Sequence, residues 1–324
     1  MLREEIIQHL GEDWTSLNTY IRESLVSDIA LLQEVNDNLV SHSGKMLRPM
    51  VAILVARMLN GGKASQESIK VAAAVEMLHN ATLLHDDVAD ESPTRRGEPT
   101  LASKIGPSAA VLVGDFWLAK AMSLTLNSAR RGAMAKVISK AMTNLAEGEM
   151  LQLQKSFQQD TNEQDYFRVI YCKTASLFEA ACLGAAITSD APQTQQDSVA
   201  LYARCLGIAF QIRDDILDYL GDSSLGKPVG IDLKEQKITL PLLCAMKDSP
   251  REGEIRKMIA QIDEHPEYCE QIRKFVLDRE GTVMAEKVLQ EYIDKSIAAL
   301  SSFPDGKDKD FLIRIARYNT IRKI

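Results

Sequence analysis

Apolar residues recur with the 3.6-residue period of an α-helix along most of this 324-residue chain, and that period is the main sequence signal for helical structure. Between Trp14 and Val40, leucines and isoleucines return at close to this period. No stretch alternates apolar and polar residues for long, and no Asn-Gly or Asp-Gly pair joins two such stretches into a hairpin. The sequence therefore predicts an all-α fold.

The helices are predicted to form one large domain over residues 1–324. The polar breaks between them have the dimensions of loops, and no linker rich in Gly, Ser or Pro separates two halves. The stretches 71–84, 175–187 and 206–217 are apolar on most faces of a helix. Helices of that kind are buried, so we expect these three at the centre of the domain.

Composition limits the classes of function. The net charge of −7 excludes a basic field over the whole chain for binding nucleic acid. No apolar run approaches the roughly 18 residues that span a bilayer, and the N-terminal sequence is too acidic and too broken for a signal peptide. The five cysteines lack CxxC spacing, which argues against a zinc site and indicates a reducing compartment. We therefore expect a cytoplasmic protein without a transmembrane segment.

Two clusters of aspartates with the same DDxxD spacing end apolar helices: Asp86, Asp87 and Asp90 form the first, and Asp214, Asp215 and Asp218 the second. Residues four apart share a helix face, so the outer two aspartates of each cluster point the same way. Oxygen donors of this kind suit Mg²⁺, which binds a few carboxylates together with substrate phosphates. One cluster alone would be a solvated helix end. Two clusters predict acidic helix tips that face each other across a pocket and hold Mg²⁺ on a phosphate ligand.

Cationic residues in loops rich in Gly and Pro, and in one apolar helix, accompany the acidic clusters: Lys45, Arg48, Arg95, Arg96, Lys173, Lys227, Lys234 and Lys237. Arg recognises phosphate through two parallel hydrogen bonds, and Lys provides a point charge. Neither GxxxxGK[ST] nor a GxGxxG after a strand occurs, so the nucleotide-binding folds are disfavoured. The two sets of charges predict a multiply charged phosphate ligand bridged by Mg²⁺.

With these residues the chain resembles the trans-isoprenyl diphosphate synthases, the polyprenyl synthetase family, over nearly its whole length. The resemblance is carried, in chain order, by GKMLRP, DDVAD with RRGEPT, GDFWLAKA, EGEMLQLQ, KTASLFEA, FQIRDDILD and GKPVGIDLKEQKITLPL. It implies a single helical bundle around a deep central cavity, the isoprenoid synthase type I fold, working as a homodimer. It also implies a prenyltransferase that condenses an allylic diphosphate head-to-tail with isopentenyl diphosphate, with Mg²⁺ as cofactor and a transient membrane contact for product release.

The resemblance also implies roles for individual residues. Its Mg²⁺ ligands are Asp86, Asp90 and Asp214, with Asp87 in support and Asp218 acting through water. Its allylic diphosphate site contains Lys173, Lys237, Lys227 and Arg95, with Phe210 and Gln211 beside the reacting carbons. Its isopentenyl diphosphate site contains Lys45, Arg48, His79 and Arg96. Catalysis rests on Asp86, Asp90, Asp214, Lys173 and Lys237, while Glu149 and Gln152 match the long-chain form of the motif in the middle of the chain.

Three positions depart from the family pattern. Its GGKRxRP sequence reads Ser43-Gly44-Lys45-Met46-Leu47-Arg48-Pro49 here, so the first glycine and the first arginine are replaced. This change puts in doubt the geometry of the loop and its affinity for isopentenyl diphosphate. Trp117 in GDFWLAKA is also bulkier than the family pattern leads us to expect.

Product length depends on the residues one turn before the first aspartate cluster. In the family, aromatic residues at the positions of Ala81 and Thr82 stop growth at short products. Both residues are small here, so we expect the cavity to continue past Leu78 to Val71, roughly 16 Å from Thr82. That depth holds several five-carbon units and favours a product longer than about twenty carbons, such as a quinone side-chain precursor. The floor residue is left open among Leu78, Met77 and Met142.

Four alternatives remain at this point. A geranylgeranyl or farnesyl diphosphate synthase would make a shorter product. A class I terpene cyclase would share the Mg²⁺ site but would not need the second diphosphate site. A non-catalytic subunit of a heteromeric synthase usually lacks an aspartate cluster, whereas both are intact here. A helical interaction scaffold would have no affinity for diphosphates. The preferred allylic primer and the downstream pathway are open as well.

Overall fold

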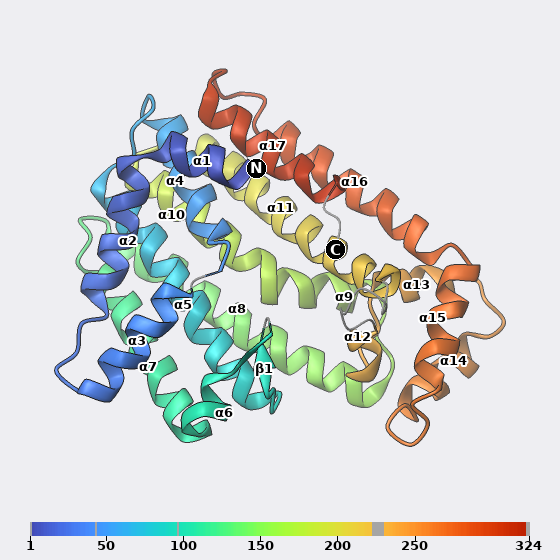
Figure 1. Ribbon diagram of the computed structural model, residues 1–324. Helices are drawn as coiled ribbons and strands as arrows, with labels where there is room; N and C mark the ends of the chain where they lie inside the picture. The colour runs from blue at the N-terminus through green and yellow to red at the C-terminus, as the bar shows by residue number, and fades with distance from the viewer. Residues whose placement is uncertain (1, 43, 96, 222–229, 322–324) are drawn as a thin grey trace. The chain divides into compact units, whose positions relative to one another are not determined.

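The computed structural model describes residues 2–42, 44–95, 97–221 and 230–321. Within these ranges almost every element is a helix, as Figure 1 shows. The strands there, β1 (Thr94–Arg95) and β2 (Glu98–Pro99), form one antiparallel pair in which Thr94 lies opposite Pro99. The prediction of an all-α fold is confirmed.

The bounds of the helices follow the apolar periods and the breaks between them. The first half of the chain forms α1 (Leu2–Leu10), α2 (Glu12–Ser24), α3 (Ala30–Ser41), α4 (Leu47–Leu59), α5 (Gln66–Ala89), α6 (Leu101–Ile105), α7 (Pro107–Leu126) and α8 (Arg131–Gln158). The second half forms α9 (Glu163–Ile170), the π-helical turn η1 (Tyr171–Ala175), α10 (Ser176–Thr188), α11 (Gln193–Leu220), α12 (Ile231–Lys234), α13 (Leu240–Met246), α14 (Glu252–Ala260), α15 (Tyr268–Asp278), α16 (Gly281–Ala299) and α17 (Lys307–Ile321).

The chain packs into two compact units. Unit 1 comprises Met1–Lys140, Ala180–Ala200 and Phe303–Leu312, and unit 2 comprises Ala141–Glu179, Leu201–Ser302 and Ile313–Ile324. Helices α8, α10, α11 and α17 each contribute residues to both units. The single domain over residues 1–324 stays a prediction.

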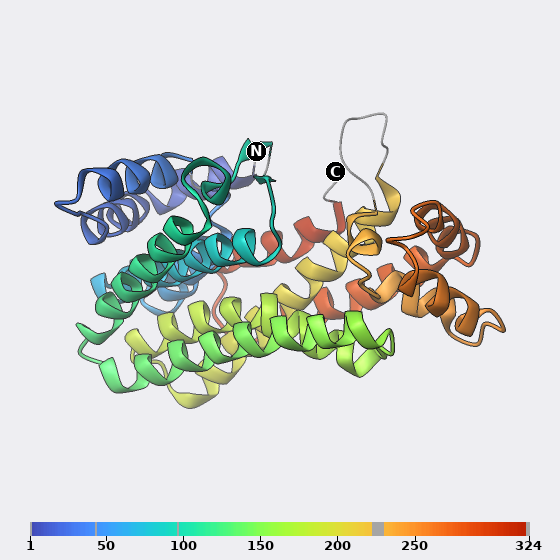
Figure 2. The same cartoon turned by 90° about the horizontal axis from the view of Figure 1, so that it is seen from below.

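In unit 1, α5 packs along α4 and α7; Figure 2 shows the cyan α5 and the green α7 side by side. Small residues allow this close approach, since Ala72 and Ala81 of α5 are fully buried. A Cβ added to Gly114 of α7 would lie 2.3 Å from Nε2 of His85 on α5, far inside normal contact distance. Close packing therefore fixes the end of α5, which carries the first aspartate cluster.

Trp117 ties α7 to α3 in the same unit. Its indole Nε1 donates a hydrogen bond of 2.8 Å to Oδ1 of Asn36, whose Nδ2 donates one of 2.7 Å to the carbonyl oxygen of Leu25. Trp117 and Asn36 are both buried, and buried polar groups need partners of this kind. The bulky residue of the GDFWLAKA motif is thus a structural residue.

In unit 2, the helices after α11 build a core of their own. Leu233 and Leu242 pack with Ile255 of α14 and Phe275 of α15 in one buried cluster, which Tyr219 near the end of α11 also joins. Figure 1 shows α14 and α15 side by side. This core holds the end of α11, which carries the second aspartate cluster, together with Leu233 and Ile238.

Among the residues that the structure describes, two helical stretches are long and apolar enough to cross a membrane, which the sequence did not lead us to expect. They are Pro107–Leu126, with a mean hydropathy of 1.4, and Glu163–Thr188, with 1.3. The second is 78% buried, as in the core helix of a globular protein. The first is only 33% buried, so α7 presents apolar side chains on its surface.

Candidate active site

The first aspartate cluster lies at the C-terminal end of α5 in unit 1. Asp86 is half-buried, and Asp90, the residue that caps the helix, is exposed. The amide of Asp90 donates to the carbonyl oxygen of Asp86 at 2.8 Å, so the last turn is intact and both side chains lie on one face. These two carboxylates are therefore accessible to a cation.

Asp87, the middle residue of this cluster, points the other way. It is 5% exposed, and its Oδ1 accepts a hydrogen bond of 2.6 Å from Nε of Arg95, on β1. One residue further along a helix is a rotation of about 100°, which turns this side chain away from the face of Asp86. Asp87 was predicted to support the metal and Arg95 to bind diphosphate; the structure brings the two together as an ion pair.

The second cluster, near the C-terminal end of α11 in unit 2, repeats this arrangement. Asp215, its middle residue, is 3% exposed and accepts hydrogen bonds of 2.6 Å from the hydroxyl of Tyr166 and 2.8 Å from Nε2 of Gln211. Burial raises the pKa of Asp215 well above its usual value, and the nearby carboxylate of Asp232 adds to that rise. Burial likewise raises the pKa of Tyr166, so its hydroxyl keeps the proton that it donates.

The outer residues of the second cluster differ from each other in their contacts. Asp214 is half-buried and lies on the same helix face as Asp218. Asp218 accepts hydrogen bonds from the amides of Ile231 and Asp232. Burial raises the pKa of Asp218, and burial together with the charge of Asp218 raises the pKa of Asp232 to about 7.

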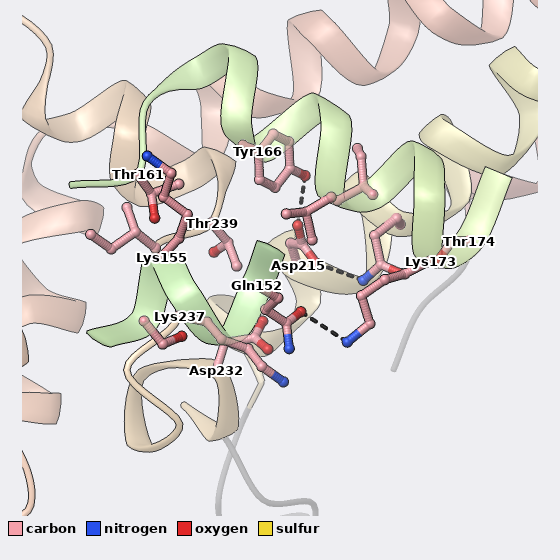
Figure 3. Close-up of a pocket in the computed structure, with 15 residues that line it drawn as sticks. Gln152, Lys155, Thr161, Tyr166, Lys173, Thr174, Asp215, Asp232, Lys237 and Thr239 are labelled. Atoms are coloured by element: carbon pink, nitrogen blue, oxygen red, sulfur yellow. Dashed lines mark hydrogen bonds between the residues drawn. The ribbon is translucent and has the colours of Figure 1, made fainter. Parts of the chain in front are cut away.

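A cavity of about 180 Å³ in unit 2 collects many of the predicted residues (Figure 3). Its wall contains Lys173, Thr174 and Gln211, together with Asp215, Asp232 and Lys237. The hydroxyl of Thr174 donates a hydrogen bond of 2.8 Å to Oε1 of Gln211, and Gln211 in turn donates to Asp215. The structure thus brings Lys173, Lys237 and Gln211, all predicted from sequence, around one cavity.

Lys173 lies in the π-helical turn η1, between α9 and α10. Its Nζ is 2.5 Å from Oε2 of Glu149 and 3.0 Å from Oε1 of Gln152, as the dashed line to Gln152 in Figure 3 shows. Single π-helical turns are rare and are frequent at functional sites. Glu149 and Gln152, matched from sequence to the long-chain motif, therefore hold the ammonium group at the cavity.

Two glycines bring neighbouring helices against η1. A Cβ on Gly148 of α8 would lie 2.6 Å from Cβ of Cys172 and 3.0 Å from Cγ of Lys173. A Cβ on Gly207 of α11 would lie 2.5 Å from Cα of Ala175. Neither approach has room for a side chain, so both glycines fix where Lys173 lies.

The predicted isopentenyl diphosphate residues that the structure describes lie in unit 1, at the start of α4 and on α5. Lys45 is exposed, and His79 is half-buried. Burial of the guanidinium lowers the pKa of Arg48 to about 10, against the opposing charge of Glu76. Met46, where the family has an arginine, has a left-handed backbone with φ of 50° and is the N-cap of α4, a conformation that costs a non-glycine residue energy.

The remaining predicted residues are placed as follows. Arg96 and Lys227 lie outside the described residues. Phe210 is half-buried, with its ring 6.1 Å from that of Phe178. Ala81 and Leu78 are buried, and Thr82 is half-buried. Met77 lines a small pocket with Trp117, on the face of α5 opposite Thr82 by helical phase.

Sequence reasoning missed Tyr166 and Asp232. Tyr166 precedes Lys173 by two helical turns, so helical spacing could have indicated that the two side chains share a face. Asp232 lies within GKPVGIDLKEQKITLPL, in which the lysines were predicted to bind diphosphate and the aspartate was assigned no role. Both residues line the same cavity as Lys173.

Asp86, Asp90 and Asp214 meet the requirements of Mg²⁺ in donor type. They are carboxylates at accessible helix ends, and Mg²⁺ prefers oxygen ligands while keeping waters and phosphate oxygens in its shell. Among the residues that the structure describes, no group of three or more His, Cys, Asp or Glu side chains converges to hold a metal ion. Protein ligands that leave coordination sites open to phosphate and water are typical of Mg²⁺ bound with a diphosphate.

The family model for polyprenyl synthetases matches residues 29–276. The chain belongs to the polyprenyl synthetase family. It is 38% identical to octaprenyl diphosphate synthase of Escherichia coli strain K12, with 97% of each chain covered. It is 36% identical to the geranyl-diphosphate-specific all-trans-nonaprenyl-diphosphate synthase of Rhodobacter capsulatus, over 97% of this chain and 96% of that one.

The fold agrees with this assignment. A crystal structure of polyprenyl synthase from Caulobacter crescentus CB15, complexed with calcium and isoprenyl diphosphate, matches with a TM-score of 0.89 and 33% identity. The match covers 99% of this chain and 98% of that one. The chain therefore has the isoprenoid synthase fold and is a prenyltransferase, as the sequence predicted.

Gly148→Ala should weaken the binding of an allylic diphosphate while the chain still folds. The new methyl group has to displace η1, and misplacing a binding group by about 1 Å can cost roughly a hundredfold. We expect a loss of affinity between tenfold and a hundredfold in isothermal titration calorimetry with an unreactive allylic diphosphate analogue. Gly132→Ala on the same helix, where a Cβ meets nothing within 4 Å, is the matched control and should bind normally. Equal affinities for the two variants would contradict this role of Gly148.

Proposed function

We propose that the protein is a long-chain all-trans-polyprenyl diphosphate synthase, which adds isopentenyl diphosphate head-to-tail to an allylic diphosphate. Two observations carry the proposal: the accessible carboxylates of Asp86 and Asp90 in unit 1 and of Asp214 in unit 2, and the cavity of unit 2 whose wall contains Lys173 and Lys237. The octaprenyl and nonaprenyl synthases among its relatives support the long product.

Asp86, Asp90 and Asp214 are the residues that would hold Mg²⁺. Their oxygen donors and exposure fit this ion. Bound Mg²⁺ would stabilise the negative charge that develops on the leaving diphosphate.

The chain's own cations assist the first chemical step. Lys173 and Lys237 place positive charge at the cavity wall, where fixed charges stabilise a departing diphosphate at no cost in reorganisation. Loss of the diphosphate leaves an allylic cation, and the double bond of isopentenyl diphosphate attacks it to form the new carbon–carbon bond. The released diphosphate can accept the proton whose loss forms the trans double bond, so a dedicated general base is not required. An apolar cavity protects the cation from water.

The length of the product follows from the face of α5 that carries Asp86. Thr82 lies about 40° from Asp86 around the helix and Ala81 about 140°, so Thr82 is the residue on the substrate's side. Further along this face, Val71 meets Gly184 of α10, where a Cβ would lie 2.6 Å from Cγ1 of Val71 and 3.0 Å from Cε of Met134. We place the end of the growing chain near this contact, about 16 Å from Thr82.

Mass spectrometry of the reaction products tests the proposed function. Purified protein with farnesyl diphosphate, isopentenyl diphosphate and Mg²⁺ should give a polyprenyl diphosphate longer than twenty carbons, and removal of the metal by EDTA should stop product formation. A product that stays at fifteen or twenty carbons would favour a short-chain synthase. Turnover of farnesyl diphosphate without isopentenyl diphosphate would favour a terpene cyclase, and no turnover would favour a non-catalytic subunit.

Thr82→Phe should shorten the product. The ring would occupy the half-buried face beside Asp86 and block growth after the first additions, so we expect the main product at twenty carbons or fewer in the same mass measurement. Ala81→Phe is the comparison: Ala81 is fully buried, and overpacking such a site typically costs about 1–3 kcal/mol in stability. An unchanged product from a folded Thr82→Phe enzyme would rule out this path for the chain.

We further infer that the enzyme works as a homodimer in the cytoplasm. None of the five cysteines, all of which the structure describes, forms a disulfide, which suits a reducing compartment. On α7, Leu112 is 68% exposed and Leu126 is 47% exposed. On α8, Met150, Leu153 and Phe157 form an exposed stripe with helical spacing. Exposed apolar patches of this kind mark interaction surfaces, and a second copy would cover them. We propose in addition that the enzyme contacts a membrane transiently when it releases its product.

Leu112→Glu should convert the protein from dimer to monomer, because a buried unpaired charge is costly at an apolar interface. Light scattering after size-exclusion chromatography should give twice the chain mass of 36.0 kDa for the wild type and the chain mass for the variant. Val283→Glu, at a residue of α16 that is 47% exposed, controls for the added charge and should stay dimeric. A monomeric wild type would contradict the proposal.

A further inference from the structure

Asp218, the last residue of the second cluster, makes an unusual set of contacts for a residue expected to act on a metal. Its Oδ1 accepts a hydrogen bond of 3.1 Å from the amide of Ile231, and its Oδ2 accepts one of 3.2 Å from the amide of Asp232. Its backbone carbonyl oxygen accepts a third, of 3.1 Å, from the amide of Gly230. Asp218 of α11 thus accepts hydrogen bonds from three consecutive amides, those of residues 230–232.

These contacts determine the course of the segment 230–237. Gly230 takes a left-handed conformation with φ of 73°, which turns the chain so that the next two amides meet Asp218. The short helix α12 follows, and buried Leu233 anchors it in the core of unit 2. The amide of Lys237 donates a hydrogen bond of 2.8 Å to the carbonyl oxygen of Asp232. The position of Lys237 therefore depends, through Asp232, on Asp218.

The segment brings two charged side chains to the cavity. Asp232 and Lys237 both line it, opposite Lys173 in the close-up of Figure 3. Lys237 also pairs with Glu235 of the same segment. Release of the amides of Ile231 and Asp232 from Asp218 would loosen the N-terminal end of this segment, and the position of Lys237 would become less defined.

We propose that Asp218 is a positioning residue, which caps the segment 230–237 and presents Lys237 to the allylic diphosphate, rather than a ligand of the metal. Each of its carboxylate oxygens already accepts an amide hydrogen, so a cation would have to compete with both amides. Asp214, one turn earlier on the same face, has the metal-binding role in this cluster. The role of Lys237 rests on the proposed function, whereas the capping role of Asp218 does not.

Hydrogen exchange measured by NMR or by mass spectrometry tests the capping role without any substrate. Asp218→Asn keeps one acceptor oxygen and Asp218→Ala keeps none. We expect the amides of Ile231 and Asp232 to exchange about tenfold faster in the asparagine variant, since a hydrogen bond to a charged group is lost, and faster still in the alanine variant. Asp214→Asn is the matched control and should leave these amides unchanged. Unchanged exchange in both Asp218 variants would overturn the proposal, whatever the enzyme's activity.

Steady-state kinetics separates positioning from metal binding. Asp218→Asn should raise KM for the allylic diphosphate about tenfold, by the loss of a charged hydrogen bond, and leave the Mg²⁺ concentration for half-maximal rate within twofold of the wild type. Asp214→Asn should raise the Mg²⁺ requirement. Calorimetric titration of Mg²⁺ with inorganic diphosphate should give the same metal affinity for Asp218→Asn and the wild type. An increased Mg²⁺ requirement for Asp218→Asn, equal to that of Asp214→Asn, would show that Asp218 is a ligand.

Discussion

The active-site geometry depends on the hydrogen bonds that hold one buried aspartate between the outer aspartates of each DDxxD cluster, near the end of its helix. In each DDxxD cluster the middle aspartate is buried and has a dedicated donor: Arg95 for Asp87, and Tyr166 with Gln211 for Asp215. Burying an unpaired charge is expensive, and hydrogen-bonded partners offset that cost. The anchored middle residue fixes the rotation of the helix, which leaves Asp86 and Asp90 of the first cluster and Asp214 of the second on an accessible face.

Lys173 is also a charged residue whose position is fixed by its neighbours. A flexible lysine becomes a defined binding group only when its backbone and its head are both held. Gly148 and Gly207 bring α8 and α11 against η1, while Glu149 and Gln152 receive the ammonium group. Small residues in unit 1 act in a similar way, since Gly114 lets α7 approach α5. Close backbone approach and paired charges together hold Lys173 in a defined position, as the proposed binding of a leaving diphosphate requires.

Periodicity and spacing predicted the helices and the two acidic helix ends, because these features depend on residues close together in sequence. The choice of Lys173 and Lys237 among the many cations came from the resemblance to the family. The roles of Asp87 and Asp218 could not be predicted in the same way. Their partners, Arg95 and the amides of Ile231 and Asp232, lie 8 to 14 residues further along the chain, and only the folded structure shows that they reach these aspartates. Tyr166 escaped notice because a tyrosine in an apolar helix is usually a core residue, and only its contact with Asp215 shows a further role. The π-helical turn has no clear sequence signal at all.

A crystal structure of the protein with Mg²⁺ and an unreactive allylic diphosphate would test most directly whether Asp86, Asp90 and Asp214 bind metal while the buried Asp87 and Asp215 anchor the helices. The account predicts metal density on Asp86 and Asp90 and on Asp214, with Asp215 still hydrogen-bonded to Tyr166 and Asp218 still on its two amides. Metal ions coordinated by Asp215 or Asp218, with those hydrogen bonds broken, would contradict it.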